Sequence, residues 1–376
     1  MIYLDHAATS WPKPPSVVRA VAECMEEAGG NPGRGAHPLA MRAAEALFAC
    51  REAAASLLGA PGPEHVAFTM NATYALNMAI KGVARPGDHL LLDSMAHNAT
   101  ARPVFALAAA GVSYDLVDLH GGGAAALASL AAACRRNTRA VIVTHVPNIS
   151  NRAAPLSEIG AFCRRRGLCL IVDAAQSAGA FPIDAAGWGI DVLCAPGHKG
   201  LCGPQGCGLL LFGRDEFALG PTILEGGSGV RSLERGMPDA LPERYEAGTP
   251  PTPALAGLTE GIRFVRAHGE AAILAHERAL RETAAAPLRR TPRVRLYDDG
   301  PGAVLLFNID GMPSPAVGEA LAQRGICVRA GFHCAPLAHR ALGTGGSGAV
   351  RASFGLSNSP GDARALADAV SEIARA

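Results

Sequence analysis

The sequence predicts an α/β protein built on a mostly parallel, doubly wound sheet in a large domain, with a smaller α+β domain beside it. The first half of the chain alternates short, continuous apolar runs with segments of helical spacing. Such runs suit strands that are buried on both faces, and their alternation with helices is typical of parallel sheets. After about residue 258 the strand-like runs are fewer and more widely spaced, which predicts the second domain.

The expected strands of the first half are short and rich in Leu, Ile and Val. They lie at 89–93, 112–118, 141–144, 168–172, 191–195 and 206–212. The segment 66–82 is expected to form a strand, a turn and a helix. Helical spacing is found at 16–27, 41–58, 103–110, 123–135 and 156–166.

The second half begins after a Gly- and Pro-rich stretch, 213–257, which is typical of a long surface loop. Further helices are expected at 253–268, 271–288 and 315–324, and strands at 294–296, 303–309 and 326–329. We expect residues 15–257 to form the large domain, and residues 1–14 with 258–376 to form the small one.

Composition excludes several classes of protein. The 376 residues are 49% hydrophobic and 18% charged, with a net charge of +1, so nothing predicts a nucleic-acid partner. The chain has no apolar run of the ~18 residues that a membrane span needs, and no signal-peptide pattern is visible. No histidine pair accompanies the ten cysteines, so no metal site is predicted. We expect a soluble, cytoplasmic protein.

An acid and a lysine follow two neighbouring strands of the predicted sheet. Asp173 directly follows the run 168–172, and Lys199 follows the run 191–195 in a Gly-His-Lys-Gly turn. Open α/β sheets bind ligands at the carboxyl ends of their strands. Pyridoxal phosphate (PLP) needs a lysine for its Schiff base and a carboxylate for its pyridine nitrogen. On this pair alone, an ordinary salt bridge remains an alternative.

Three more polar residues are expected at the same edge. Thr73 lies near the start of a helix, where free N–H groups and the helix dipole suit a phosphate. His97 and Asn148 follow the runs 89–93 and 141–144. A helix cap or a solvated loop explains each residue singly, but their clustering predicts a PLP site.

Two residues near the C-terminus could act on a substrate. Cys334 lies on a loop after a strand, where a thiol could be an accessible nucleophile. Arg351 begins a strand-like run, where its guanidinium could clamp a carboxylate. A harmless cysteine and a surface arginine are the plainer alternatives.

Several motifs extend along nearly the whole chain. They are YLDHAATS (3–10), NPGRGAH (31–37), NAT (71–73), VDAAQS (172–177), GHKG (197–200), YEAGTP (245–250), RAGFHCAP (329–336) and RASFG (351–355). In combination they resemble the fold-type I PLP enzymes of the class V aminotransferase group, and more narrowly the cysteine desulfurases and selenocysteine lyases. The short RAGFHC loop resembles that of the group II enzymes. The resemblance implies a homodimer that binds PLP.

The resemblance also implies which residues bind the cofactor. Lys199 would carry it covalently, Asp173 would pair with the pyridine nitrogen, Gln176 would touch the ring hydroxyl, and His97 would stack on the ring. The phosphate would be held by Ala72, Thr73 and His198, and by Thr249 from the other subunit.

For the reaction, the resemblance implies that Asn148 and Arg351 bind the substrate carboxylate and that Cys334 accepts the sulfur. L-Cysteine would become L-alanine, with a persulfide left on Cys334 for a sulfur-acceptor protein, and His97 would carry protons. A selenocysteine lyase acting on L-selenocysteine and an aminotransferase remain alternatives. A non-catalytic scaffold would need neither Lys199 nor Asp173.

Three positions depart from the family pattern. Pro196 replaces a serine that contacts phosphate in many relatives, which predicts a missing or replaced phosphate bond. Pro147 stands where a serine is usual, beside the retained Asn148. Phe332 stands where group II enzymes often have a histidine, which could alter sulfur transfer or selectivity.

Overall fold

The computed structural model describes residues 1–33, 35–215, 217, 219–297 and 300–376. Within these ranges the strands form three sheets, of seven, four and two strands. The large sheet has the order β2-β8-β7-β6-β5-β3-β4. Its strands are β2 (Val66–Thr69), β3 (His89–Asp93), β4 (Ser113–Val117), β5 (Thr138–Thr144), β6 (Cys169–Asp173), β7 (Val192–Pro196) and β8 (Gly208–Phe212).

The large sheet is mostly parallel, as the sequence predicts. The exception is β8, which runs antiparallel to both β2 and β7. A parallel return needs a crossover of a dozen or more residues, usually a helix. The connection 197–207 is a short run of turns without a helix, so β8 returns beside β7 in the opposite direction.

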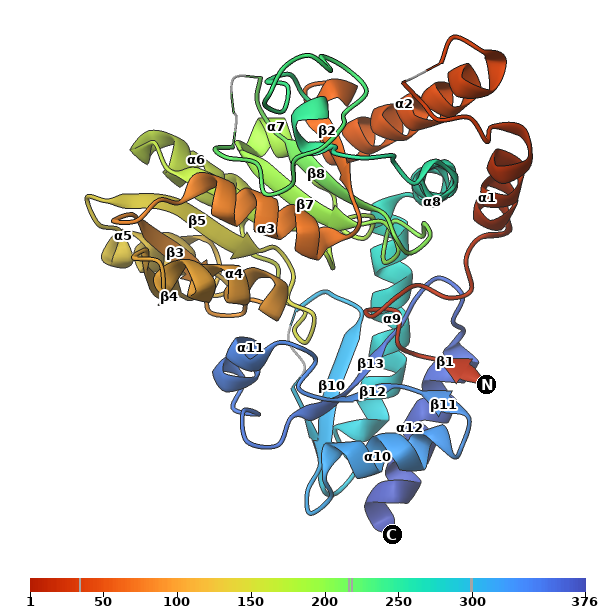
Figure 1. Cartoon of the computed structure of the whole chain (residues 1–376). Helices are drawn as coiled ribbons and strands as arrows, with labels where there is room; N and C mark the ends of the chain where they lie inside the picture. The colour runs from red at the N-terminus through yellow and green to blue at the C-terminus, as the bar shows by residue number, and fades with distance from the viewer. Residues whose placement is uncertain (34, 216, 218, 298–299) are drawn as a thin grey trace.

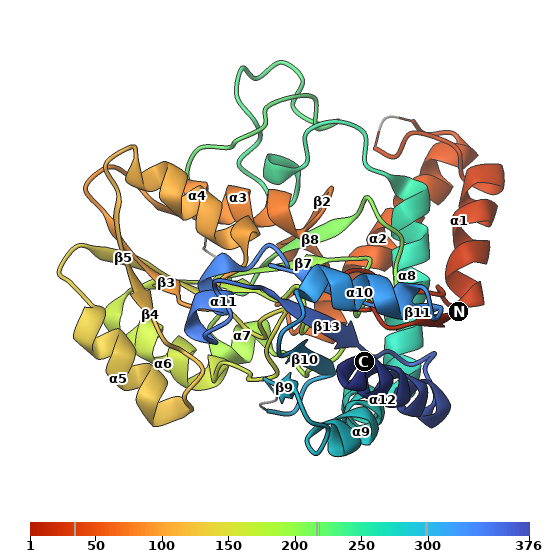
Figure 2. The ribbon, with the colours of Figure 1, turned by 90° about the horizontal axis from the view of Figure 1, so that it is seen from below.

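Helices cover both faces of the large sheet (Figures 1 and 2). Alternate residues of β6 show why: Leu170 and Val172 pack into one hydrophobic cluster, and Cys169 and Ile171 into the other. The sheet is therefore doubly wound. The helices up to the second domain are α1 (Pro15–Glu27), α2 (Pro38–Leu58), α3 (Ala72–Val83), α4 (Asn98–Ala108), α5 (Gly123–Ala133), α6 (Leu156–Arg166), α7 (Ala185–Trp188) and α8 (Thr252–His268), with 3₁₀ turns η1 (Pro63–His65) and η2 (Glu243–Tyr245).

The small sheet is antiparallel and lies below the large one in Figure 1. Its strands, in the order β12-β13-β10-β9, are β9 (Val294–Leu296), β10 (Val304–Ile309), β12 (Arg329–Gly331) and β13 (Ala349–Ser353). A separate hydrophobic cluster joins it to α9 (Glu270–Leu288), α10 (Ser314–Ala322) and α12 (Pro360–Arg375). The third sheet pairs β1 (Ile2–Tyr3) with β11 (Ile326–Cys327). The domain boundaries at 14/15 and 257/258 stay a prediction.

Some elements differ from the expectation. The single strand expected at 326–329 is two strands, because β11 pairs with β1 while β12 pairs with β13 in the small sheet. Helix α4 begins at Asn98, earlier than expected, since the His97 side chain caps it. Helices α11 (Pro336–Ala341) and α12 were not predicted. Among the helices in the described ranges, none combines the length and apolar character needed to cross a membrane.

Candidate active site

A pocket of about 530 Å³ lies at the carboxyl ends of β5, β6 and β7. The lining includes all five residues expected at this edge: Thr73, His97, Asn148, Asp173 and Lys199. The parallel strands bring them together from segments far apart in the sequence, as expected for a doubly wound sheet.

The amine of Lys199 has no hydrogen bond or ion pair with any residue in the described ranges. Burial lowers its pKa from 10.5 to about 8, with the nearby Asp173 carboxylate opposing this shift and the Arg351 guanidinium adding to it. An unpaired lysine with a lowered pKa has a larger fraction of free amine near neutral pH. Lys199 is therefore suited to form a covalent bond with a carbonyl group.

Asp173 lies at the end of β6 and is almost fully buried. Its Oδ1 accepts a hydrogen bond from the amide of Ala175 at 2.9 Å, and its Oδ2 accepts one from the Thr100 hydroxyl at 3.2 Å. Thr100 is itself buried, in the first turn of α4. Sequence analysis missed this threonine, although its place three residues after His97 could have indicated that it faces the same edge.

His97 caps α4 with its ring, since Nδ1 accepts a hydrogen bond from the amide of Ala99 at 3.0 Å. The proton of the neutral ring is therefore on Nε2. Burial lowers the pKa of His97, with Asp173 opposing the shift. The neutral ring can take up a second proton only at Nδ1. Its hydrogen bond from the Ala99 amide must therefore break first.

The start of α3 offers groups that suit a phosphate. Asn71 caps the helix by accepting a hydrogen bond from the amide of Tyr74 at 3.1 Å, and Ala72 and Thr73 line the pocket in the first turn. His198 lines the same pocket, and its Nδ1 is buried without a hydrogen-bond partner in the described residues. Burial, helped by the Lys199 and Lys13 ammonium groups, lowers its pKa to about 4. A neutral imidazole and free helix N–H groups fit a phosphate group here.

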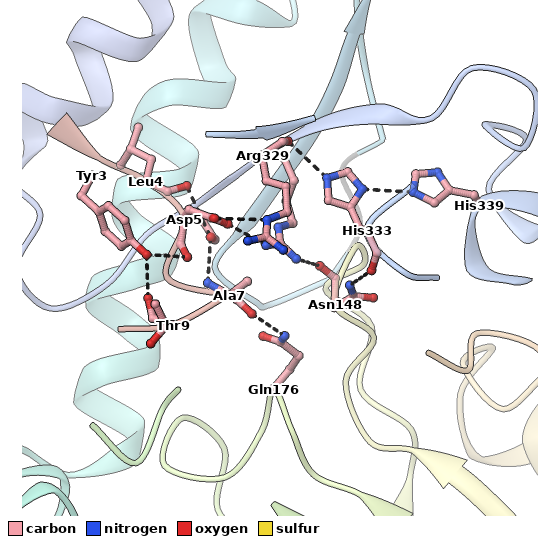
Figure 3. Close-up of polar contacts among 12 residues, drawn as sticks. Tyr3, Leu4, Asp5, Ala7, Thr9, Asn148, Gln176, Arg329, His333 and His339 are labelled. Atoms are coloured by element: carbon pink, nitrogen blue, oxygen red, sulfur yellow. Dashed lines mark hydrogen bonds and ion pairs between the residues drawn. The ribbon is translucent and has the colours of Figure 1, made fainter. Parts of the chain in front are cut away.

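The N-terminal segment reaches the pocket from the side of the small sheet (Figure 3). Gln176 lines the pocket and donates a hydrogen bond to the carbonyl of Ala7 at 2.9 Å. The carbonyl of His198 accepts hydrogen bonds from the side chains of Thr9, Ser10 and Lys13 at 2.8–3.2 Å. The residue preceding Lys199 is thus fixed by the first turns of the chain.

Arg351 is buried on β13 and lies beside Asn148. Its Nη1 donates to the Asn148 carbonyl at 3.2 Å, and its Nη2 pairs with Oδ1 of Asp5 at 2.7 Å. The other oxygen of Asp5 lies 3.2 Å from Nε of Arg329, an exposed residue on β12. Two guanidinium groups thus share one carboxylate, which leaves a net positive charge for an anionic ligand. Sequence analysis missed both Asp5 and Arg329.

Cys334 is exposed, and its backbone lies beside the pocket residues. Its carbonyl accepts a hydrogen bond from the amide of Asn98 at 2.8 Å, and the carbonyl of His333 accepts one from Nδ2 of Asn148 at 2.8 Å. Both ring nitrogens of His333 are engaged by other groups, Nδ1 by Nε2 of His339 and Nε2 by the Arg329 carbonyl (Figure 3). His333 is therefore not placed as a base for Cys334, although it precedes it in the sequence.

Thr249 lies outside the described lining of this pocket. It is exposed, and its hydroxyl accepts a hydrogen bond of 3.4 Å from Asn31. Nearby, Glu246 anchors the same segment through a bidentate ion pair with the buried Arg51, at 2.6 and 2.8 Å. Residue 34, in the NPGRGAH motif, is outside the described residues.

Comparisons with known proteins show the family of the chain. The family model of class-V aminotransferases matches residues 2–366, so the chain belongs to that family. A probable cysteine desulfurase of Methanothermobacter thermautotrophicus is 34% identical, over 99% of this chain and 94% of the relative. A cysteine desulfurase of Haloferax volcanii is 32% identical, over 98% of this chain and 88% of the relative.

Two solved structures of cysteine desulfurases superpose on nearly the whole chain. The cysteine desulfurase of Thermococcus onnurineus, in its apo form, superposes with a TM-score of 0.89 at 29% identity, covering 100% of this chain and 94% of that one. The Escherichia coli cysteine desulfurase CsdA gives 0.89 at 29% identity, covering 98% and 94%. The chain therefore has the PLP fold-type I architecture of these enzymes.

Proposed function

We propose that the protein is a PLP-dependent cysteine desulfurase, which converts L-cysteine to L-alanine and keeps the sulfur as a persulfide on Cys334. The observation that carries the proposal is the attachment of the Cys334 loop to the pocket. Asn98, which follows His97, donates to the Cys334 carbonyl, and the pocket residue Asn148 donates to the His333 carbonyl. An aminotransferase would not need an exposed thiol beside its pocket.

The residues of the pocket fit PLP. Lys199 offers an unpaired amine of lowered pKa, Asp173 a buried carboxylate, and His198 a buried ring nitrogen without a partner in the described residues. Lys199 would hold the cofactor covalently, Asp173 would pair with its pyridine nitrogen, and Ala72, Thr73 and His198 would hold its phosphate. When bound, PLP supplies an electron sink for charge that develops at the substrate α-carbon.

Two side chains would position the substrate. Arg351 would clamp its carboxylate, helped by Asn148, whose side-chain donor is the Nδ2 group that bonds to the His333 carbonyl in this structure. The unpaired Nε of Arg351 supports this role, since it leaves a donor for a further ligand. His97 would stack over the cofactor and move protons at its ring nitrogens.

Cys334 would take the sulfur as a thiolate. Its Sγ attacks the sulfur of L-cysteine, so that an S–S bond forms while the bond between the substrate sulfur and Cβ breaks. The electron pair of the broken bond stays with the substrate carbon, which gains a proton and becomes the methyl group of alanine. The persulfide left on Cys334 is then available to a thiol of a sulfur-acceptor protein.

The assembly belongs to the same proposal. The protein would act as a homodimer in the cytoplasm, with the partner subunit's Thr249 completing the phosphate site. The exposure of Thr249, outside the pocket that Lys199 lines in its own chain, supports this arrangement. We also propose residues 15–257 as the PLP-binding domain, and residues 1–14 with 258–376 as the domain that carries the cysteine loop.

The test compares wild type with Cys334→Ala in the PLP-loaded protein. With L-cysteine, wild type should release alanine and become heavier by one sulfur atom at Cys334 in peptide mass spectra. Cys334→Ala should keep the visible cofactor band and lose the alanine. Cys134→Ser, a half-buried cysteine at the end of α5, is the matched control and should behave as wild type. Alanine formation by Cys334→Ala at the wild-type rate would refute the proposal. Release of selenide from L-selenocysteine by this variant would show lyase activity instead.

A further inference from the structure

The loop that carries the proposed nucleophile has a strained backbone. His333 and Cys334 have φ angles of 53° and 54°, the left-handed region that residues with a Cβ atom rarely adopt. Such conformations persist only where the surrounding structure holds them, and they cluster at active sites. The Cys334 side chain is exposed, so its own packing does not supply the restraint. Other contacts must hold this loop.

A row of three buried side chains lies behind the loop. Nδ1 of His333 is 3.1 Å from Nε2 of His339, and Nδ1 of His339 is 2.7 Å from the hydroxyl of Thr344. At the other end, Nε2 of His333 is 3.2 Å from the carbonyl of Arg329. His339 and Thr344 are fully buried, and the ring of Phe332 packs edge-on against His339. Figure 3 shows the two imidazole rings and the bond to Arg329.

Only one arrangement of protons satisfies this row with both rings neutral. The Arg329 carbonyl can only accept, so Nε2 of His333 carries a proton and Nδ1 of His333 accepts. Nε2 of His339 must then donate to it, and Nδ1 of His339 accepts from the Thr344 hydroxyl. Burial lowers the pKa of His333 to about 3 and that of His339 to about 4, so both rings are neutral near pH 7. The row therefore holds its geometry at neutral pH.

We propose that His339 and Thr344 are positioning residues, which hold His333 and so fix Cys334 in its left-handed conformation beside the pocket. We call the row of His333, His339 and Thr344 the histidine clasp. The inference rests on the proposed function, since it assigns the clasp a part in sulfur transfer. A nucleophile that is held in the productive geometry reacts faster, because the entropy cost of reaching that geometry has been met by folding. The clasp acts on the backbone of Cys334 and exchanges no proton with its thiol.

The experiment uses the PLP-loaded protein and two pairs of variants. His339→Leu removes the donor to His333, whereas His339→Gln can still reach Nδ1 of His333 with its amide. Thr344→Val removes the hydroxyl at nearly constant shape, and Thr344→Ser keeps it. His268→Leu, an exposed histidine at the end of α8, is the matched control. Hydrogen exchange of the Ala335 amide, which bonds to the Phe332 carbonyl, reports the opening of the loop.

His339→Leu and Thr344→Val should speed exchange at Ala335 by about tenfold, the effect of one lost buried hydrogen bond on local opening. They should lower kcat for alanine formation by a similar factor and leave KM and the cofactor band unchanged. His339→Gln and Thr344→Ser should stay near wild type. The proposal is overturned if exchange at Ala335 is unchanged in both His339→Leu and Thr344→Val, or if exchange rises while kcat does not fall. If wild type shows no turnover, the proposed function is refuted. Hydrogen exchange at the Ala335 amide would still decide separately whether the clasp holds the loop.

Discussion

Replacing Arg351 by lysine tests how the substrate carboxylate is recognised. The substitution keeps the positive charge and removes the planar fork of donors. In the structure this fork already makes two contacts, to Asp5 at 2.7 Å and to the Asn148 carbonyl at 3.2 Å, with Nε left over. A single ammonium group cannot keep both contacts and also bind a carboxylate in two places. Arg351→Lys should therefore bind substrate less well.

The size of the effect follows from the lost bond. A hydrogen bond to a charged group contributes ~1.5–3 kcal/mol, so KM for L-cysteine should rise about 10- to 150-fold. Arg329→Lys is the matched control, because Arg329 shares Asp5 but is exposed. Exposed ion pairs contribute ~0–1 kcal/mol, which corresponds to at most about a fivefold change. Initial rates of alanine formation at varied L-cysteine concentrations measure both variants.

The visible PLP band shows whether the cofactor site is intact in each variant, since neither arginine lines the described cofactor pocket. It should be the same in wild type, Arg351→Lys and Arg329→Lys. If the two variants have equal KM values, the buried guanidinium does not select the carboxylate and the reasoning is wrong. A lost cofactor band in Arg351→Lys would also contradict it, because the damage would then extend to the cofactor site.

Three further predictions concern the cofactor site and the fold. Burial lowers the pKa of Lys199 from 10.5 to about 8, so the free amine forms as the pH rises through 8. The rate at which the apoprotein gains its visible PLP band should therefore rise with pH and level off above pH 8. Lys199→Ala should show no band. Thr100→Val removes the hydroxyl bond to Asp173 and should weaken PLP binding about tenfold in an absorbance titration, while Thr100→Ser should not. Glu246→Ala removes the carboxylate partner of the buried Arg51 and should lower the free energy of unfolding by about 3–5 kcal/mol in urea. An unchanged midpoint would contradict the role of this ion pair.

The sequence predicted most of the large sheet because its strands are continuous apolar runs between clear turns. Strand 89–93 and helix 156–166 were predicted at their observed bounds. The direction of β8 was not predicted, since apolar periodicity carries no information on pairing partners. The split of 326–329 into β11 and β12 was also missed, because a strand that passes from one sheet to another has the same local pattern as a single strand.

For the site, the residues that follow strands could be predicted, because parallel strands bring their carboxyl ends to one edge. Thr73, His97, Asn148, Asp173 and Lys199 line one pocket for that reason. Contacts between distant segments could not be predicted in this way. Thr100 bonds Asp173 from a helix, His339 bonds His333 from α11, and Asp5 meets Arg351 across most of the chain. The Thr100 contact had only a local signal, the place of Thr100 three residues after His97, and the other two pairs are marked neither by periodicity nor by spacing.

The first thirteen residues connect the two halves of the site. Asp5 holds the arginines of the small sheet, while Thr9, Ser10 and Lys13 hold the carbonyl of the residue before Lys199. Only a few residues separate these two sets of contacts. The segment is also anchored at its start, because β1 pairs with β11. The N-terminal segment thus links the arginines of the small sheet to the lysine turn through its own hydrogen bonds and ion pairs.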